Sequence, residues 1–337
     1  MIVGAPQAKY SVQSEARLNE QTTSNHPADT PGAIYACPIS RNKPCKRIPL
    51  TYSTIEISTP DSKGHVSFRN LHENSNCSNQ WLGASLKASA DSDGEIIACA
   101  PRWKQTWGLD GDRSQFQHMM GQCWMIKYDP YRQDFINDAH LGNKYFLTPS
   151  RNNGTFFNIN FRKGPFYRYA AFGTSIGMSK NGEDLTYALG GPGSFSFSGG
   201  FYGADKKSTY TDLYRTKDCK TSDQVALDYC EPQDLSLSSY NGYSLAISEQ
   251  MFVSPEKPKS RVFVSGAPNY EQTGMVIFTE KQNDELVEVG RIAADKILKA
   301  NDGSFIVGTS FGFSIALADL NGDDLDDLVV GIPQYSL

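Results

Sequence analysis

A run of oxygen-bearing residues near the end of the chain has the composition and spacing of a metal-binding loop. It reads Asp319-Leu320-Asn321-Gly322-Asp323-Asp324-Leu325-Asp326-Asp327. Calcium takes about six to eight oxygen ligands in a flexible loop, and five carboxylates in nine residues would repel one another strongly without a cation. We therefore expect one Ca²⁺ site here, against the alternative of a solvated acidic turn. The predicted ligands are Asp319, Asn321, Asp323, the carbonyl of Leu325, and Asp327.

This run differs from the calcium loop of helix–loop–helix proteins. Its sixth residue is Asp324 rather than glycine, and its twelfth is Val330 rather than glutamate. The flanking residues read as strands, so the run is expected in the turn of a hairpin. The corresponding turns at residues 91–95 and 179–183 lack the ladder of oxygens. The sequence therefore predicts a single metal site.

The hairpin that carries this run is the last copy of an unevenly spaced repeat. A strand end of small residues followed by proline recurs at Pro6, Pro101, Pro192, Pro268 and Pro333. An aromatic or apolar residue next to a glycine precedes the last four of these, and each interval holds two apolar segments around a polar turn. Several units continue into a third apolar strand, as in 123–126 and 274–278. Repeats of three or four strands predict the blades of an all-β propeller, against the alternative of a Gly-rich sandwich. Short surface helices are expected near 134–141 and 222–229.

Composition excludes several classes of protein. The chain has 337 residues, 39% of them hydrophobic, and a net charge of −5 without a dense basic run, so a nucleic-acid binder is disfavoured. No apolar run approaches the roughly 18 residues that span a bilayer, and we expect no membrane contact by this segment. None of the seven cysteines forms a Cys-x-x-Cys pair. Glycosylation acceptors at Asn76 and Asn153 favour an extracellular setting. Because no secretory leader or anchor is present, we expect the chain to be truncated at both ends.

These features resemble the FG-GAP repeats of the integrin α-subunit propeller. The resemblance rests on the 311–333 repeat with its acidic loop, on Gln80-Trp81-Leu82-Gly83-Ala84 followed by Ala98-Cys99-Ala100-Pro101-Arg102-Trp103, and on Gly32-Ala33-Ile34-Tyr35-Ala36-Cys37-Pro38. It implies a propeller of about seven blades, of which about four to five are present here. Residues 1–337 then form a partial propeller. Its expected parts are the end of blade 1 (1–70), blade 2 (71–160), blade 3 (161–235), blade 4 (236–300) and the start of blade 5 (301–337).

The resemblance also implies disulfides. Cys37–Cys45 and Cys99–Cys123 look like pairs of the family. Cys219–Cys230 would be a pair particular to this chain, which leaves Cys77 without a partner and the connectivity open.

By the same resemblance, the protein is an α subunit that pairs with a β subunit. The β subunit inserts a basic side chain into an aromatic-lined hole at the propeller centre, and Trp81, Tyr243 and Phe313 match positions of that lining. A cation over such rings is attracted by about 0.5–2 kcal/mol each. The alternative is that these rings fill the centre of the propeller.

The resemblance further implies an extracellular ligand-binding head of a cell-adhesion receptor, anchored by one membrane span when full length. Members that bind Arg-Gly-Asp carry an acidic residue where this chain has Ser238 and an aromatic residue where it has Ser196. A missing carboxylate removes the natural partner of a ligand arginine. A fourth blade without a cation loop also resembles the laminin-binding subgroup, so the resemblance implies a laminin-like matrix ligand.

An enzyme is disfavoured. Gly173-Thr174-Ser175-Ile176-Gly177 fits the Gly-x-Ser-x-Gly pattern, which requires a strand, a tight turn and a helix, whereas another strand is expected after it. The alternatives left open are a secreted FG-GAP propeller of a phospholipase-like enzyme and a calcium-binding propeller outside the integrins.

Overall fold

The architecture is known from a computed structural model. It describes residues 1–8, 32–39, 43–48, 56–60, 66–70, 75–76, 79–89, 94–107, 116–129, 134–137, 169–181, 184–194, 197–205, 215–216, 238–251, 260–282, 285–298 and 307–334. The chain divides into two compact units, the first made of 1–86 and 91–146 and the second of 87–90 and 147–337. Each unit is considered separately below.

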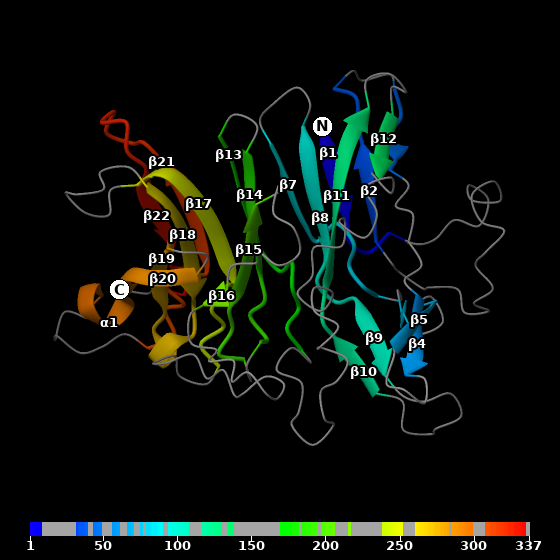
Figure 1. Ribbon diagram of the computed structural model, residues 1–337. Coiled ribbons are helices and arrows are strands. Elements are labelled where there is room, and N and C mark those ends of the chain that lie inside the picture. The colour runs from blue at the N-terminus through cyan, green and yellow to red at the C-terminus, as the bar shows by residue number, and fades with distance from the viewer. Residues whose placement is uncertain are drawn as a thin grey trace. The chain divides into compact units, whose positions relative to one another are not determined.

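The first unit contains two blades and two smaller sheets (Figure 1). Blade 1 has the order β1-β2-β3 and blade 2 the order β12-β11-β8-β7, although the last two residues of β7 are counted with the second unit. Their bounds are β1 Ile2–Ala5, β2 Ala33–Ala36, β3 Lys46–Arg47, β7 Ser85–Ala88, β8 Glu95–Ala100, β11 Gln122–Asp129 and β12 Asp134–Asn137. The smaller sheets comprise β4 Glu56–Pro60, β5 Val66–Asn70, β6 Ser75–Asn76, β9 Lys104–Trp107 and β10 Phe116–Met119.

The second unit contains three blades. Blade 3 has the order β13-β14-β15, blade 4 has β17 to β20 with β16 added in parallel beside β20, and blade 5 is the hairpin β21-β22. Their bounds are β13 Ile176–Asn181, β14 Asp184–Gly190, β15 Phe201–Asp205, β16 Arg215–Thr216, β17 Ser244–Met251, β18 Ser260–Ala267, β19 Met275–Gln282, β20 Glu285–Ala293, β21 Ser314–Ala318 and β22 Asp327–Gly331.

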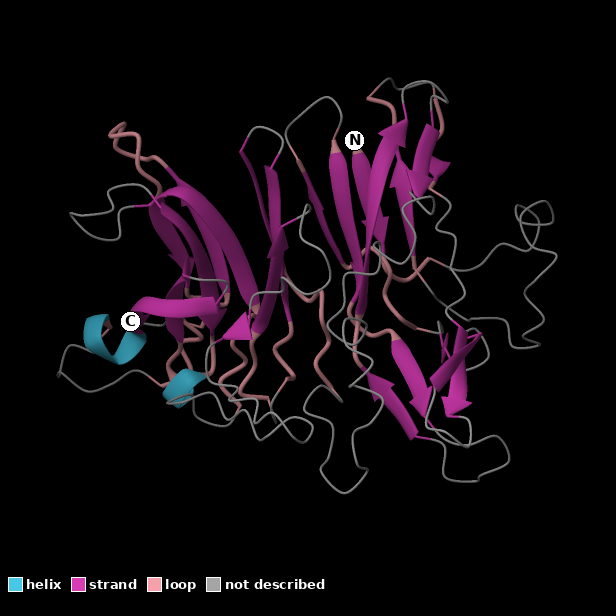
Figure 2. Ribbon diagram, viewed as in Figure 1, coloured by secondary structure: helices cyan, strands magenta, loops and turns pink. Residues whose placement is uncertain are grey.

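Strands dominate the described part of the chain, and its helices are a 3-10 turn at Tyr270–Gln272 and the four-residue α1 at Ala294–Ile297 (Figure 2). No helix there is long and apolar enough to cross a lipid bilayer. The predicted fold class, an incomplete all-β propeller of FG-GAP blades, is confirmed. The expected helix near 134–141 is wrong at 134–137, because β12 pairs with β11 from Ile126↔Asn137 to Asp129↔Asp134. The one expected near 222–229 lies outside the described residues.

The blades of the second unit pack through their first strands. β17 contacts both β13 and β21, and the buried side chains between blades 4 and 5 include Val262, Val264, Val276 and Phe311. Alternate residues of a strand point to opposite faces, so a fully buried run such as β8, Glu95–Ala100, has partners on both of its faces.

The small-residue strand ends have a mechanical reason. A Cβ at Gly266 would collide with the Gly312 carbonyl oxygen of the next blade, and a Cβ at Gly190 would collide with that of Gly242. The same carbonyl oxygens accept hydrogen bonds from serines: Ser244 Oγ donates to Gly312 O at 2.7 Å, and Ser175 Oγ donates to Gly242 O at 2.8 Å. The glycine thus leaves room for the backbone of the next blade, and the serine hydroxyl bonds the carbonyl oxygen that enters this space.

Candidate functional site

The acidic run forms the turn between β21 and β22. Asp319 organises it, because its Oδ1 accepts hydrogen bonds from the N–H of Gly322 at 2.7 Å and of Asp323 at 3.2 Å. Its Oδ2 accepts one from the N–H of Asp324 at 3.0 Å. Gly322 and Asp324 adopt positive φ of 81° and 62°, which aims successive N–H groups at one carboxylate. The N–H of Gly322 above all, together with those of Asp324, Asp323 and Asn321, lowers the pKa of Asp319 and favours its ionised form.

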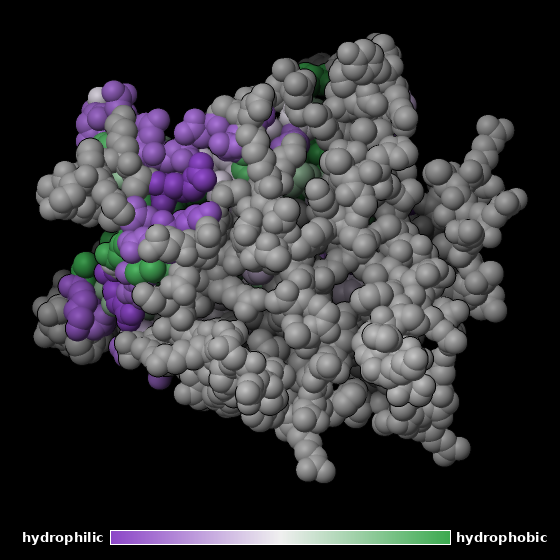
Figure 3. Space-filling model, viewed as in Figure 1, coloured by the Kyte–Doolittle hydropathy of each residue, from purple (hydrophilic) through white to green (hydrophobic). Residues whose placement is uncertain are grey.

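The side chains of the other predicted ligands also accept hydrogen bonds from backbone N–H groups of the same turn. Asp323 Oδ1 accepts from the N–H of Leu325 at 2.9 Å, and Asn321 Oδ1 accepts from that of Asp323 at 2.9 Å. Asp327 Oδ2 reaches back to the N–H of Leu320 at 2.9 Å, which closes the loop. Sequence spacing and backbone donors therefore bring all the predicted side chains onto one short turn. Figure 3 shows hydrophilic residues gathered around this end of the hairpin.

All the predicted ligand atoms are oxygens, and oxygen is the ligand type that a hard cation such as calcium prefers. In the structure, however, these side-chain oxygens point at the backbone N–H groups of their own turn. Among the residues that the structure describes, no three His, Cys, Asp or Glu side chains form a group that could hold a metal ion. A cation would draw these carboxylates off the N–H groups and toward one another. Calcium binding by this loop stays a prediction.

A second recurring feature lies at the entrance to the first strand of blades 2 to 5. It is a five-residue turn that ends in glycine, and its third residue has a φ between 52° and 63°. Such backbone is uncommon for residues other than glycine and clusters at functional sites. The second residue of each turn is fully buried. The four turns are 79–83, 169–173, 238–242 and 308–312.

In three of these turns, the carbonyl oxygen of the buried second residue accepts a hydrogen bond from the residue after the strand-end proline. The distances are 3.1 Å from Arg102 to Gln80, 3.2 Å from Gly193 to Ala170, and 3.3 Å from Asn269 to Ser239. The two sequence signals of the repeat, one at a glycine and one at a proline, therefore meet at one end of each blade.

The aromatic residues expected to line a central hole occur in two settings. In the second unit, the rings of Tyr243 and Phe313, from neighbouring blades, have their centroids 4.7 Å apart, and Phe313 is 42% exposed. In the first unit, the guanidinium carbon of Arg102 lies 4.6 Å from the centroid of Trp81. Trp81 therefore already carries a cation of its own chain, whereas Tyr243 and Phe313 form a partly open pair.

A row of aromatic side chains in the second unit was not found from the sequence. Tyr169 stacks on Phe197 with centroids 6.2 Å apart, and Phe197 meets Tyr240 edge-on at 6.0 Å. Tyr169 is 47% and Phe197 40% exposed. We call these three residues the aromatic row. Ser238 lies beside it, and its carbonyl oxygen accepts from Asn269 Nδ2 at 2.8 Å. Ser196 lies outside the described residues.

The structure contains both disulfides that the family resemblance implied. Cys37 is bonded to Cys45 and Cys99 to Cys123, the latter across a registered pair of β8 and β11. The predicted Cys219–Cys230 pair, Cys77 and Asn153 lie outside the described residues. Asn76 lies in β6, where only the backbone is described.

Ser175 does not sit in a nucleophile turn. Strand β13 begins at the next residue, Ile176, where the pattern requires a helix. Its hydroxyl is committed to the Gly242 carbonyl oxygen. The Gly-x-Ser-x-Gly pattern here therefore serves the contact between two blades.

Comparisons with known proteins agree with this repeat. The FG-GAP repeat matches residues 311–336. Integrin alpha-4 of Xenopus laevis is 29% identical over 346 residues, which cover 100% of this chain and 26% of that protein. Integrin alpha-3 of Cricetulus griseus is 27% identical, with 90% and 23% covered, and integrin alpha-7 of Rattus norvegicus 24%, with 99% and 24% covered.

The chain thus spans about a quarter of the length of these relatives. Among solved structures, the exotype rhamnogalacturonan lyase YesX aligns with a TM-score of 0.32 and 13% identity, over 91% of this chain and 47% of the lyase. The predicted resemblance to integrin α subunits is confirmed by the curated relatives and the repeat match.

Proposed function

We propose, from a resemblance to integrin α subunits that runs along the whole chain, that this protein is the extracellular ligand-binding head of a cell-adhesion receptor. The observation that carries the proposal is the set of α-subunit relatives, which cover 90 to 100% of the chain. The chain then works outside the cell, on a receptor held in the plasma membrane by segments beyond this one, and it pairs with a β subunit.

The Tyr243–Phe313 pair is the proposed contact for a basic side chain of the β subunit. Two ring faces from neighbouring blades form it, and Phe313 is substantially exposed. A cation that loses water over the exposed face of such a ring gains about 2 kcal/mol or more. Trp81 is a weaker candidate for such a contact, because Arg102 lies over its ring and would repel a second cation.

The aromatic row is the proposed ligand surface. Exposed aromatic side chains are the usual anchors of protein interfaces, because they bury a large area at a low cost in side-chain entropy. Ser238 stands beside the row without a carboxylate, so a ligand arginine would find no charged partner at that position. This favours a laminin-like matrix protein over an Arg-Gly-Asp ligand.

Calcium in the β21–β22 turn is proposed as a structural cofactor. Asp319, Asn321, Asp323 and Asp327, with the Leu325 carbonyl, would hold it. Bound there, the cation would neutralise the repulsion among the loop carboxylates and stabilise the hairpin.

The proposed function has no catalytic step. The α-subunit relatives are receptors, and this supports a protein that is not an enzyme. The hydroxyl of Ser175, the residue that a nucleophile pattern singles out, bonds a backbone carbonyl instead of a general base.

The test is an adhesion assay with the intact receptor on cells that lack other laminin receptors. We expect attachment to laminin in the presence of calcium and poor competition by an Arg-Gly-Asp peptide. Tyr169→Ala should reduce attachment about tenfold at equal surface expression, since loss of an interface anchor commonly costs more than about 1 kcal/mol. The matched control is Val329→Ala on β22, which is also 47% exposed. Attachment that the peptide blocks at low concentration would contradict the laminin-like ligand.

A further inference from the structure

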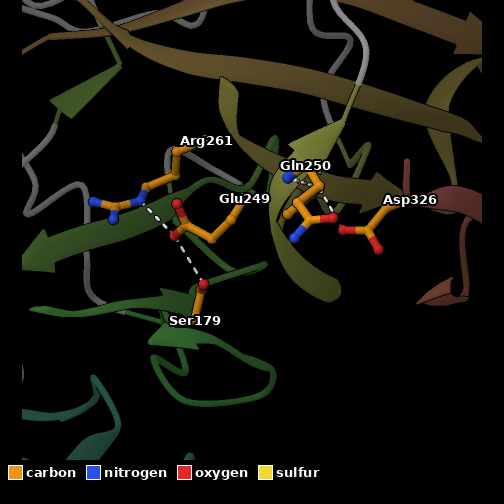
Figure 4. A network of polar contacts seen from close by, with 6 residues as sticks. Ser179, Glu249, Gln250, Arg261 and Asp326 are labelled. Atoms are coloured by element: carbon orange, nitrogen blue, oxygen red, sulfur yellow. Dashed lines mark hydrogen bonds and ion pairs between the residues drawn. The ribbon is translucent and has the colours of Figure 1, made fainter. Parts of the chain in front are cut away.

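The C-terminal end of β17 in blade 4 makes polar contacts with blade 3 on one side and with blade 5 on the other. On one side, Glu249 Oε1 accepts a hydrogen bond from Ser179 Oγ of blade 3 at 2.8 Å and forms an ion pair with Arg261 of its own blade at 2.6 Å (Figure 4). In that view, Asp326 lies beside Gln250 on the other side. Successive side chains of one strand thus serve different neighbours.

The contact with blade 5 is made by Ser248, Gln250 and Asp326. Asp326 Oδ2 accepts a hydrogen bond from Ser248 Oγ at 2.6 Å, and the N–H of Asp326 donates to the carbonyl oxygen of Gln250 at 3.2 Å. Ser248 Oγ in turn accepts from the N–H of Gln250 at 3.0 Å. A backbone donor, a hydroxyl and a carboxylate therefore form one continuous chain. We call these bonds the docking contact.

The docking contact is strong for its size. Ser248 is 1% exposed, and a hydroxyl bonded to a carboxylate is a charge-assisted donor, about twice as strong as a neutral one. If Asp326 were truncated, the buried hydroxyl would lose its acceptor, which is costly.

Asp326 stands between two predicted cation ligands, Leu325 and Asp327, yet its carboxylate turns away from the loop. Asp327 Oδ2 bonds the N–H of Leu320 inside the turn, while Asp326 Oδ2 bonds Ser248 of blade 4. The two carboxylates belong to adjacent residues, so holding one in blade 4 fixes the direction of the other toward the loop.

We propose that Asp326 is a positioning residue: through Ser248 it docks the acidic turn on blade 4, and it thereby sets the cation affinity of the loop without contacting the cation. The proposal rests on the calcium site proposed above. Partners of this outer kind commonly change metal affinity by about 10- to 100-fold. Blade 4 thus tunes a site whose ligands all come from blade 5.

The experiment follows hydrogen exchange of the peptide covering residues 314–331 in the intact protein, as a function of calcium concentration. This readout is local, so cation sites elsewhere do not enter it. The calcium concentration at half-maximal protection should rise about tenfold in Ser248→Ala and about tenfold in Asp326→Ala. The double variant should show no further rise, because both changes break the same bond.

Two asparagine variants separate positioning from ligation and from net charge. Asp326→Asn keeps an oxygen that can accept from Ser248, so its midpoint should stay within about threefold of the original protein, whereas loss of a true ligand would cost far more. Asp324→Asn removes the same charge from an exposed residue of the same loop, and asparagine tolerates the positive φ found there. Its calcium midpoint should match that of Asp326→Asn.

Three results would overturn the proposal: an unchanged midpoint in Ser248→Ala, additive effects in the double variant, or loss of calcium protection in Asp326→Asn. A different result would contradict the calcium site alone, namely no effect of calcium on the original protein. In that case, exchange in chelator still tests the docking. Ser248→Ala and Asp326→Ala should each speed exchange of this peptide, and the double variant should not exceed either one.

Discussion

Blades 2 and 4 solve one packing problem in two ways. Both have a fully enclosed strand end two residues before a proline, at Cys99 in blade 2 and at Gly266 in blade 4. In blade 2 this residue is bonded covalently to Cys123, its registered partner on the next strand. In blade 4 the registered partner of Gly266 is Val276, and the missing side chain gives room to a carbonyl of blade 5.

The difference shows that the repeat fixes where a blade needs support but not how the support is provided. A disulfide stabilises a sheet mainly by restricting its unfolded chain. A glycine acts in the folded state, by letting two backbones meet. Breaking each device should therefore leave a different signature.

The largest effect is expected from removal of the disulfide in blade 2. The Cys99→Ala/Cys123→Ala variant should lose about 3 kcal/mol of unfolding free energy, because the bond closes a loop of 24 residues. Denaturant unfolding of the intact protein, followed by exchange in β8 and β11, measures this. A loss of stability confined to blades 3 to 5 would contradict the claim that this disulfide stabilises blade 2.

A smaller loss is expected when a side chain is placed at the strand end of blade 4. Gly266→Ala should cost about 2 kcal/mol, since its Cβ meets the backbone of blade 5 and the blades must separate. The matched control is Gly290→Ala in the same sheet, where the nearest atom to a Cβ is Phe278 Cδ2 at 3.8 Å. Equal melting temperatures of the two variants would break the comparison.

Blade 5 extends the comparison, because its support is expected from a metal. Asp323→Ala should abolish the rise in melting temperature that calcium produces. With calcium at ten times its dissociation constant, the loss corresponds to about 1.4 kcal/mol. Differential scanning calorimetry with calcium and with chelator measures it. If the original protein melts at one temperature under both conditions, the turn is a solvated acidic turn.

The smallest effect is expected from the serine that accompanies the glycine. Ser244→Ala removes one buried hydrogen bond to the Gly312 carbonyl oxygen and should cost about 1 kcal/mol. Ser175→Ala, which removes the equivalent bond between blades 3 and 4, should cost about the same. Unequal costs for the two would show that the repeat positions are not energetically equivalent.

The features predictable from the sequence were those with local signals. The hairpins followed from the glycine and proline spacing, and the cysteine pairs followed from a family resemblance. The aromatic row joins three segments, at Tyr169, Phe197 and Tyr240, none of which has a local pattern that points to the others. The same holds for the docking contact, where Ser248 and Asp326 are 78 residues apart. The left-handed backbone of Trp81 and Tyr240 was also hidden, since propensity argues against it.

The most direct test of the account is association with a β subunit. The intact protein should be co-expressed with an integrin β subunit and recovered through a tag on that subunit. We expect the original protein and Val329→Ala to be recovered equally, and the Tyr243→Ala/Phe313→Ala variant about tenfold less, as for loss of an interface anchor. Recovery of that variant at the level of the original protein would contradict the proposed contact of the Tyr243–Phe313 pair with the β subunit. Failure of the original protein to associate with any β subunit would contradict the receptor function itself.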